Sequence, residues 1–523
     1  MKTTLSAQVV VVGAGHNGLV AATFLARAGL QVIVLEEKNK VGGAVKTEFP
    51  FAKAPLLGTS TGAYLLGVMP PELLTRLGID MPLVRRDPHY FLPTETERYL
   101  LLGSDEKEVH RQFAAFFSEA DWDANRRLNL EIGQLREDLA PSWLHEPLSA
   151  EATADRYIRP ALRQVFLDLL NNPVEQYLAR FGFRSELLMA MYAVTDGFSG
   201  LSSGFGQKGV GFNFLVHNMC RLPGADGTFM IVKGGMGTVT QKLAQAAVQA
   251  GARILTAAKV AKIDSHGGTT QGVVLEDGRR IDAPVVVCNA DPFRMLKLAG
   301  PDALPADYVA KIESMRRTGT TMKVNLALSD LPRFTCLPEQ RGQHSTTIHL
   351  LPPEHEGGGP IARIRAGHEK VMRGELDPFP TIEWYIHTEA DPSLRDAKGH
   401  HNSALFVQWV PYQLSGTTWE KEEDRYVKQL LAIADRFAPG TSDLVVDTFT
   451  LTPPKIEQHF GITGGHIHHV DNTLAMDQRV PYTTPLSGLY SCSAGCHPAG
   501  SVLGGAGHNA AQRILADLGL PHE

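Results

Sequence analysis

Three glycines near the start of the chain have the spacing of a loop that binds the diphosphate of a dinucleotide. Gly13, Gly15 and Gly18 form the pattern G-x-G-x-x-G. Glycine permits a tight turn and lets backbone N–H groups at a helix N-terminus approach the negatively charged diphosphate. Glu36 follows Gly13 by 23 residues, and its carboxylate can accept hydrogen bonds from ribose hydroxyls. We therefore predict a dinucleotide site in this segment.

A second glycine pair indicates which dinucleotide is bound. Gly42 and Gly43 lie six residues beyond Glu36 and permit another close backbone pass over the same diphosphate, as in flavin-binding chains. Residues 487–511 are again rich in glycine and lead into a helix expected at about residues 509–518. The N-terminus of that helix can face negative charge on a reduced flavin. We therefore predict FAD rather than NAD.

The elements expected around the first glycines form a βαβ unit. Residues 8–12 are a short run of β-branched residues typical of a buried parallel strand. Residues 19–28 follow as a helix, and residues 31–35 form a second apolar run. Residues 284–290 predict another buried strand much later in the chain.

The pattern between these strands changes, which predicts two interleaved domains in an α/β fold. Amphipathic helices dominate from about residue 70 to residue 223, before strand character returns. We expect a Rossmann-like FAD-binding domain and an interleaved α+β substrate domain with a helical insertion. The first is expected to comprise residues 1–70, 225–300 and 470–523, and the second residues 71–224 and 301–469.

Composition and charge exclude several classes of protein. The 523 residues are 43% hydrophobic and 20% charged, as in globular rather than disordered or collagen-like proteins. The formal net charge is -6 and no Lys/Arg run occurs, so we expect no nucleic-acid partner. Five irregularly spaced cysteines favour a reducing compartment, and neither a signal peptide nor a membrane-spanning apolar stretch is expected. We expect a cytoplasmic location, with peripheral membrane contact and oligomeric state left open.

Motifs over nearly the whole chain resemble those of phytoene desaturase-like FAD-dependent oxidoreductases. They include GAGHNGLVAA and VIVLE near the start, VVVCNADP at residues 285–292, WVPY at residues 409–412, and HPAGSVLGGAGHNAA near the end. Within this group the chain is most similar to the branch named pyridine nucleotide-disulfide oxidoreductase domain-containing protein 2. Two departures bear on the substrate rather than on FAD. Ala44 stands where many desaturases have Arg, and residues 497–500 read HPAG where relatives often have consecutive glycines.

The resemblance implies a flavoprotein of the two-dinucleotide-binding-domain type with non-covalent FAD. It places the diphosphate at the early glycines, the adenosine ribose at Glu36 and the adenine at the Val260 backbone. The glycines of the last segment are expected to line the ribityl chain and the flavin. The residues expected to bind FAD are Gly13, Gly15, His16, Asn17, Gly18, Glu36, Glu37, Gly42, Gly43, Val260, Gly495, Gly504, Gly505, Ala506, Gly507 and Asn509.

Candidate catalytic residues follow from what flavin chemistry requires of a protein. A flavin accepts a hydride, while the protein positions the substrate, excludes water and sometimes supplies a base. His468, His469 and His497 are the candidate bases, and Tyr412 is a candidate positioning group.

A histidine cluster and a cysteine pair are expected to be structural rather than a metal site or a redox pair. His466, His468 and His469 could suggest a metal site, but no second half of a ligand set accompanies them, so no metal is expected. Cys492 and Cys496 differ in spacing from the Cys-x-x-Cys of redox pairs. We expect two small side chains packed near the flavin.

These observations favour an FAD-dependent oxidoreductase that moves a hydride between flavin N5 and a hydrophobic substrate. An isoprenoid, a carotenoid-like compound or another long-chain molecule would be desaturated, saturated or isomerised, with O2 or a quinone as electron acceptor. A flavin amine oxidase is one alternative, because one fold can host both chemistries. A non-enzymatic interaction protein that retains FAD as a structural element is another.

Overall fold

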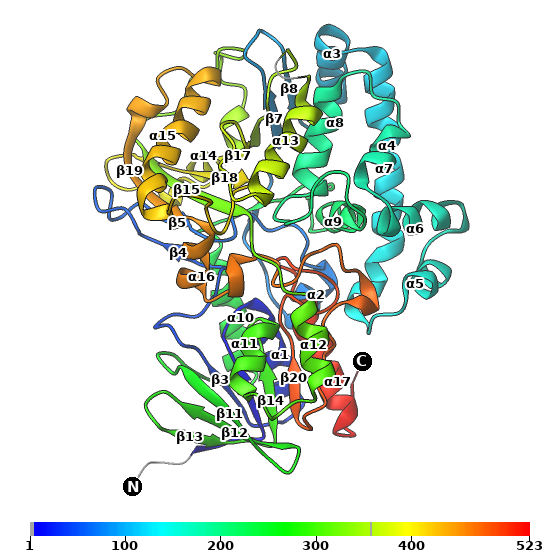
Figure 1. The fold of residues 1–523 in the computed structure, drawn as a ribbon, viewed down its shortest axis with the longest axis vertical. Coiled ribbons are helices and arrows are strands. Elements are labelled where there is room, and N and C mark those ends of the chain that lie inside the picture. The colour runs from blue at the N-terminus through cyan, green and yellow to red at the C-terminus, as the bar shows by residue number, and fades with distance from the viewer. Residues whose placement is uncertain (1–4, 356–357, 523) are drawn as a thin grey trace.

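The computed structural model describes residues 5–355 and 358–522. Two regions follow one another along its long axis, and each is built on its own large sheet (Figure 1). Both ends of the chain lie in the lower region, and the upper region holds the seven-stranded sheet beside a group of helices.

A five-stranded parallel sheet forms the centre of the lower region. Its valine-rich strands are buried because α1 (His16–Arg27) packs against β2 and β3, while β12 of a second sheet contacts β14. Helix α1 also contacts α10 (Gly237–Gln249) and α17 (Gly505–Asp517). The strands lie in the order β10 (Arg253–Leu255), β3 (Val32–Leu35), β2 (Val9–Val12), β14 (Val285–Cys288) and β20 (Leu489–Ser491), all parallel.

Both glycine-rich helices begin earlier than their sequence pattern suggests. Helix α1 starts at His16 rather than at residue 19, because Gly15 already adopts the N-cap conformation. Helix α17 starts at Gly505 rather than at about residue 509, directly after Gly504 in the left-handed region at φ +75°. Glycines therefore form the first turns of these helices, where the backbones come close together.

A smaller four-stranded sheet and short elements complete the lower region and the junction. The sheet has the order β1 (Leu5–Ser6), β13 (Arg280–Asp282), β12 (Thr269–Leu275) and β11 (Val260–His266). The short elements of this region and the junction include β4 (Thr47–Glu48), β5 (Thr59–Ser60), α2 (Pro71–Leu77), β6 (Leu83–Val84), β9 (Ile231–Val232), α11 (Pro292–Ala299), α12 (Ala306–Ser314) and α16 (Pro453–Phe460).

The upper region is built on a seven-stranded mixed sheet to which two distant stretches of the chain contribute. Five strands come from residues 321–451, and two come from residues 90–102. Helices α13 (Pro360–Met372), α14 (His387–Ala390) and α15 (Trp419–Phe437) lie in the upper region with it (Figure 1). The order is β19 (Val445–Leu451), β15 (Thr321–Leu328), β18 (His401–Gln408), β17 (Thr381–Tyr385), β16 (Thr347–Leu350), β7 (Tyr90–Pro93) and β8 (Tyr99–Leu102).

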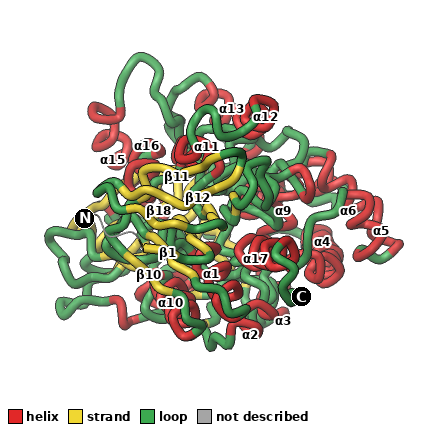
Figure 2. Tube along the Cα trace, turned by 90° about the horizontal axis from the view of Figure 1, so that it is seen from below, coloured by secondary structure: helices red, strands yellow, loops and turns green. Residues whose placement is uncertain are grey.

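The helical insertion gathers on one side of the molecule, as the view from below shows (Figure 2). Its apolar stripes form a core of their own; Phe166, Leu169 and Leu170 of α6 are buried in it, as their spacing predicts. The helices are α3 (Glu106–Phe116), α4 (Glu119–Leu139), α5 (Ala150–Tyr157), α6 (Arg163–Asn171), α7 (Val174–Ala179), α8 (Glu186–Tyr192), a π-helical turn η3 (Ala193–Gly197) and α9 (Val210–His217).

This architecture confirms the expected α/β class, with a Rossmann-like parallel sheet next to a mixed sheet and helices. The domain boundaries assigned from the sequence stay a prediction. They agree with the sheet composition in one respect, because β7 and β8 join strands from the later half of the chain.

Candidate functional site

The cavity that contains the glycine-rich loop, called the main cavity here, lies at the carboxyl ends of the parallel strands, where they face the seven-stranded sheet. Gly13 after β2, Glu36 after β3 and Asn289 after β14 line it from the lower region. Lys323 of β15 and Glu383 of β17 line it from the upper region. Ligands of open α/β sheets bind at this end of the strands, so one cavity joins a dinucleotide position to a second chamber.

The glycine-rich loop presents an uncapped helix N-terminus to the cavity. Gly15 caps α1 without a side-chain hydrogen bond, and the first turn carries no acidic residue, so backbone N–H groups remain for an anion. Gly13 adopts a φ of +99°, and its N–H donates to Leu35 O at 2.7 Å. A Cβ on Gly18 would lie 2.3 Å from Gly13 O, which explains why glycine is needed there although Gly18 does not line the cavity.

The second glycine pair lies against the first, as expected for two passes over one diphosphate. The Gly42 N–H donates to Ala14 O at 3.0 Å, and Gly43 adopts a φ of +58°. A Cβ on Gly43 would lie 3.6 Å from Gly15 Cα. Gly15, Gly42 and Gly43 all line the cavity, together with His16 and Asn17.

Glu36 is held at the end of β3 by backbone donors. Ala14 N–H donates to its Oε2 at 2.9 Å and Lys38 N–H to its Oε1 at 3.0 Å. Burial raises the pKa of this carboxyl. Glu37 and Val260 also line the cavity, and Glu37 forms an ion pair with Arg294 at 3.1 Å. The expectation that these residues contact the adenosine part of the cofactor stays a prediction.

The structure places the last glycine-rich segment mainly behind the cavity wall, and its expected contact with the cofactor stays a prediction. Ala494, Ser501 and Val502 line the cavity. A Cβ on Gly507 would lie 2.1 Å from Asn17 O, so that glycine lets α17 pack on α1. Asn509 donates to Trp143 O at 3.1 Å and His145 O at 3.0 Å, so its amide is used within the fold. The members of this segment that do not line the cavity are Gly495, Gly504, Gly505, Ala506, Gly507 and Asn509.

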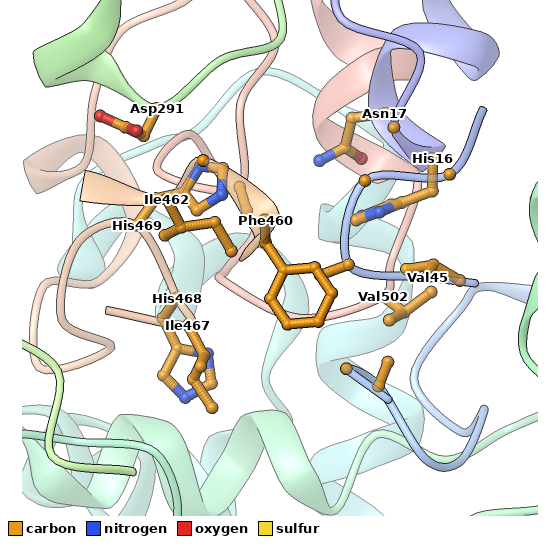
Figure 3. Close-up of a pocket in the computed structure, with 18 of the residues that line it drawn as sticks. His16, Asn17, Val45, Asp291, Phe460, Ile462, Ile467, His468, His469 and Val502 are labelled. Atoms are coloured by element: carbon orange, nitrogen blue, oxygen red, sulfur yellow. The ribbon is translucent and has the colours of Figure 1, made fainter. Parts of the chain in front are cut away.

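Two of the four candidate catalytic side chains reach the cavity. His468 and His469 lie across it from His16, with Phe460 between them in Figure 3. Burial lowers the pKa of His468 to about 3 and that of His469 to about 4, so both imidazoles are neutral at physiological pH. His468 Nε2 lies 3.3 Å from Ser199 O, and the Nδ1 atoms of both His468 and His469 are buried with no partner among the described residues. A neutral imidazole with a free nitrogen can accept a proton.

The other two candidates, His497 and Tyr412, do not line the cavity, and their roles stay a prediction. His497 Nε2 lies 3.3 Å from Ser142 O, in the contact between the C-terminal segment and the helical insertion. The Tyr412 hydroxyl donates to the Glu457 carboxylate, and Tyr412 O accepts a hydrogen bond from Trp419 Nε1 at 3.1 Å. Both side chains are therefore used for packing and local hydrogen bonding.

Asp291 is a residue of the cavity that the sequence did not single out. Its carboxylate caps α11 by accepting from Phe293 and Arg294 N–H, each at 3.0 Å. The same carboxylate accepts from Thr463 N–H and Oγ1, each at 3.0 Å. Asp291 thus fixes the loop that carries His468 and His469 onto the parallel-sheet region. It belongs to the VVVCNADP motif, which was noticed without a role.

The upper end of the cavity contains a charged pair that also escaped the sequence analysis. Lys323 is 5% exposed and Glu383 is 8% exposed. Glu383 accepts from Ser199 Oγ at 3.2 Å and from the Tyr385 hydroxyl, and its Oε1 lies 3.7 Å from His349 Nε2. The Lys323 ammonium lies 4.1 Å from the Tyr64 ring centroid and 4.5 Å from that of Phe406. The sequence signal was a lone lysine in the otherwise uncharged strand TMKVNLAL.

A second cavity adjoins the first through a shared wall. Thr195, His217, Phe229 and Thr347 line both. The second cavity lies between the helical insertion and the edge of the seven-stranded sheet, and many of its lining residues are charged. Its charged residues are Arg86, Arg126, Arg127, Arg136, Glu106, Asp123, Asp196 and Asp226.

The cysteines and histidines give no sign of another redox or metal centre. Cys492 and Cys496 are free and buried, and burial raises the pKa of both thiols. Among the described residues, no group of three or more His, Cys, Asp or Glu side chains is arranged to hold a metal ion. Within the same residues, no helix has the length and apolar character needed to cross a membrane.

The cavity combines a glycine-rich loop, the buried Glu36 carboxylate and a second chamber. Known proteins share parts of this sequence and fold. Residues 18–351 match the family model described as flavin containing amine oxidoreductase. The chain belongs to this family. Membership in this family makes the chain an FAD-dependent oxidoreductase.

Named relatives agree with the resemblance read from the motifs. Mouse pyridine nucleotide-disulfide oxidoreductase domain-containing protein 2 is 33% identical, and the alignment covers 97% of this chain and 93% of the mouse protein. Hydroxyneurosporene desaturase of Cereibacter sphaeroides is 27% identical, with 98% of each chain covered. Putrescine oxidase shares the fold, with a TM-score of 0.59, 16% identity and 99% of each chain covered.

Proposed function

We propose that this FAD-dependent oxidoreductase moves a hydride between a carbon atom of a hydrophobic, long-chain substrate and the flavin. The observation that supports the proposal is the continuity of one cavity from the glycine-rich loop to an apolar and aromatic chamber. Phe460, Ile462 and Ile467 surround the middle of this cavity (Figure 3), and Tyr64 and Phe406 line its upper end. Such walls suit a hydrocarbon chain and exclude water from it.

The residues of the cavity fit FAD by the donors they leave free. The uncapped N-terminus of α1 suits the diphosphate, and Glu36 suits the ribose hydroxyls. Asn17 Oδ1 and His469 Nδ1 are buried without protein partners among the described residues, as expected for atoms that meet a bound group. FAD, when bound, supplies the two-electron acceptor of the reaction.

The chain's own residues supply positioning and a place for the proton. Desaturation removes a proton as well as a hydride, so a base must stand near the substrate. His469 is the residue we propose for this role, because it is neutral and, unlike His468, has no ring nitrogen hydrogen-bonded within the described residues. Asp291 positions it through the hydrogen bonds to Thr463.

The proposed redox role is tested by the visible absorption spectrum of the purified protein, followed by anaerobic dithionite titration and admission of air. We expect bound flavin that bleaches and returns, with O2 or a quinone as acceptor. A flavin that resists reduction would instead mean that FAD is only structural. Isoprenoid and long-chain probes are then screened for flavin bleaching under anaerobic conditions.

Amine oxidation is a second candidate, which the family model and the putrescine oxidase fold favour. It predicts that amines bleach the flavin anaerobically and that peroxide forms once air is admitted, whereas long-chain hydrocarbons cause no bleaching. The same anaerobic screen, run with putrescine and cyclohexylamine, separates the two candidates.

A further inference from the structure

Lys323 carries a buried charge that the protein leaves without a polar partner. Its side chain lines the main cavity and is 5% exposed. In the part of the chain that the structure describes, no hydrogen bond or ion pair reaches its ammonium, and its neighbours are the ring faces of Tyr64 and Phe406. A cation over aromatic rings is attracted to them, but this attraction does not replace hydration or an ion pair.

The sheet explains why the nearest buried carboxylate does not neutralise this charge. Lys323 of β15 pairs with Phe406 of β18, and Phe406 pairs with Glu383 of β17, so the three residues form one cross-strand row. Neighbouring strands are about 4.8 Å apart, so the backbones of Lys323 and Glu383 are about 10 Å apart across the sheet. The Phe406 ring lies between the two side chains. The Glu383 carboxylate instead accepts hydrogen bonds from the hydroxyl groups of Ser199 and Tyr385.

At this end of the chamber Glu383 is hydrogen-bonded within the protein, whereas the Lys323 ammonium has no hydrogen-bond partner among the described residues. A pure hydrocarbon would leave the ammonium as it is, buried and unpaired, and a cationic amine would be repelled by it. A carboxylate would both neutralise the charge and accept its hydrogen bonds. A second cavity with many charged residues lies on the other side of the wall formed by Thr195, His217, Phe229 and Thr347, next to this chamber.

We propose that the substrate is an amphipathic carboxylate, whose anionic head binds Lys323 while its apolar chain extends past Phe460 towards the flavin position. This inference rests on the proposed function and adds the chemical class of the substrate. Lys323 acts in it as a specificity-determining residue.

The proposal is tested with three probes that share a ten-carbon chain and differ in the head group. Sodium decanoate, decanol and decylamine are titrated into the FAD-loaded protein by isothermal calorimetry. We expect decanoate to bind about tenfold to about a hundredfold more tightly than the other two, as a charge-assisted hydrogen bond predicts. Lys323→Met should abolish this preference, and Lys323→Arg should retain most of it. Lys421→Met, at an exposed lysine of α15, is the matched control and should behave as the wild type.

Three results would overturn the proposal. In the first, decanol or decylamine binds the wild type as tightly as decanoate. In the second, the preference for decanoate survives in Lys323→Met. In the third, none of the probes binds at all. Failure of the proposed redox function is recognised separately, because FAD content and the dithionite titration are measured without any probe.

Discussion

Lys323 and Glu383 lie in one row of the seven-stranded sheet, two strands apart, with Phe406 between them. The row continues to His349 of β16, which pairs with Glu383. Alternation along strands brings all four side chains to the same face, the one that lines the cavity. Opposite charges thus stand at a fixed separation on one face of the sheet, and among the described residues only the carboxylate is hydrogen-bonded.

The glycine-rich loop gives the first prediction. Gly15→Val should lower the affinity for FAD by at least about tenfold, because its side chain occupies the approach of the diphosphate to α1. Even a Cβ at this position would lie 2.8 Å from Asn289 Nδ2. The measurement is the ratio of flavin to protein absorbance after dialysis. Gly133→Val is the control, since an added Cβ there meets nothing within 4 Å; equal FAD retention in both variants would contradict the assignment of the loop.

The buried ammonium of Lys323 predicts that its replacement by an apolar residue increases the free energy of unfolding. Burial lowers the pKa of Lys323 to about 7, whereas an unfolded lysine titrates at about 10.4. Between these values the unfolded state binds more protons, so the wild type gains stability as the pH rises from about 7 to about 10. Lys323→Met should be about 1–4 kcal/mol more stable than the wild type at neutral and lower pH, and the difference should shrink towards pH ~10.

This stability difference is measured by denaturant unfolding over a pH series. The control Lys421→Met should remain within about 0.5 kcal/mol of the wild type at each pH. A variant Lys323→Met that is less stable than the wild type at neutral pH would show that the ammonium has a compensating partner.

Glu48 predicts a loss of stability in acid. Burial opposes its charge, but hydrogen bonds from His459 at 2.9 Å and from Thr61, together with Lys46 at 3.2 Å, lower its pKa to about 2. An unfolded glutamate titrates at about 4.3, so this contribution is complete above that pH and is lost as the pH falls towards about 2.

Glu48→Gln should therefore cost about 1–3 kcal/mol of unfolding free energy at neutral pH. The cost should disappear near pH ~2, because the wild-type carboxyl is then protonated as well. Thermal unfolding at matched ionic strength measures both points. A difference between the two proteins that does not change with pH would mean that Glu48 acts through packing alone.

The shared wall of the two cavities predicts a change in access. Phe229 lines both cavities, and Phe229→Ala should open the wall while leaving the backbone carbonyl that Arg86 binds at 3.0 Å. The initial rate at which dithionite reduces the bound flavin should rise several-fold. Phe183→Ala, at a residue that packs in the helical insertion and lines neither cavity, is the matched control. Equal rates in the two variants would exclude the second cavity as a route.

Local patterns in the sequence predicted the dinucleotide half of the site. The glycines, Glu36 and the paired Gly42 and Gly43 lie within one βαβ unit, where spacing along the chain fixes spacing in space. The last glycine-rich segment shows the limit of the same argument. Close packing of two helices and close approach to a cofactor both require glycine, so the sequence alone does not tell the two uses apart. The structure shows that Gly507 lies in the contact between α17 and α1, whereas Ser501 lines the cavity.

The substrate half was not predictable in the same way. The row of Lys323, Phe406 and Glu383 depends on the register of three strands that are separated by loops and helices. Strand register follows from tertiary pairing, which hydrophobic spacing alone does not reveal. His497 and Tyr412 were chosen for residue type, and both proved to be held in hydrogen bonds outside the cavity.

The parallel pairing of β7 with β16 determines the order in which the protein can be completed on the ribosome. Tyr90 pairs with Thr347, so the β7–β8 hairpin emerges long before the strand that covers its edge. During that interval the hairpin exposes unpaired backbone groups, which are prone to join other chains. Neither large sheet is complete until distant parts of the chain have been made. A nascent chain that ends before β16 lacks the strand that pairs with this edge of β7.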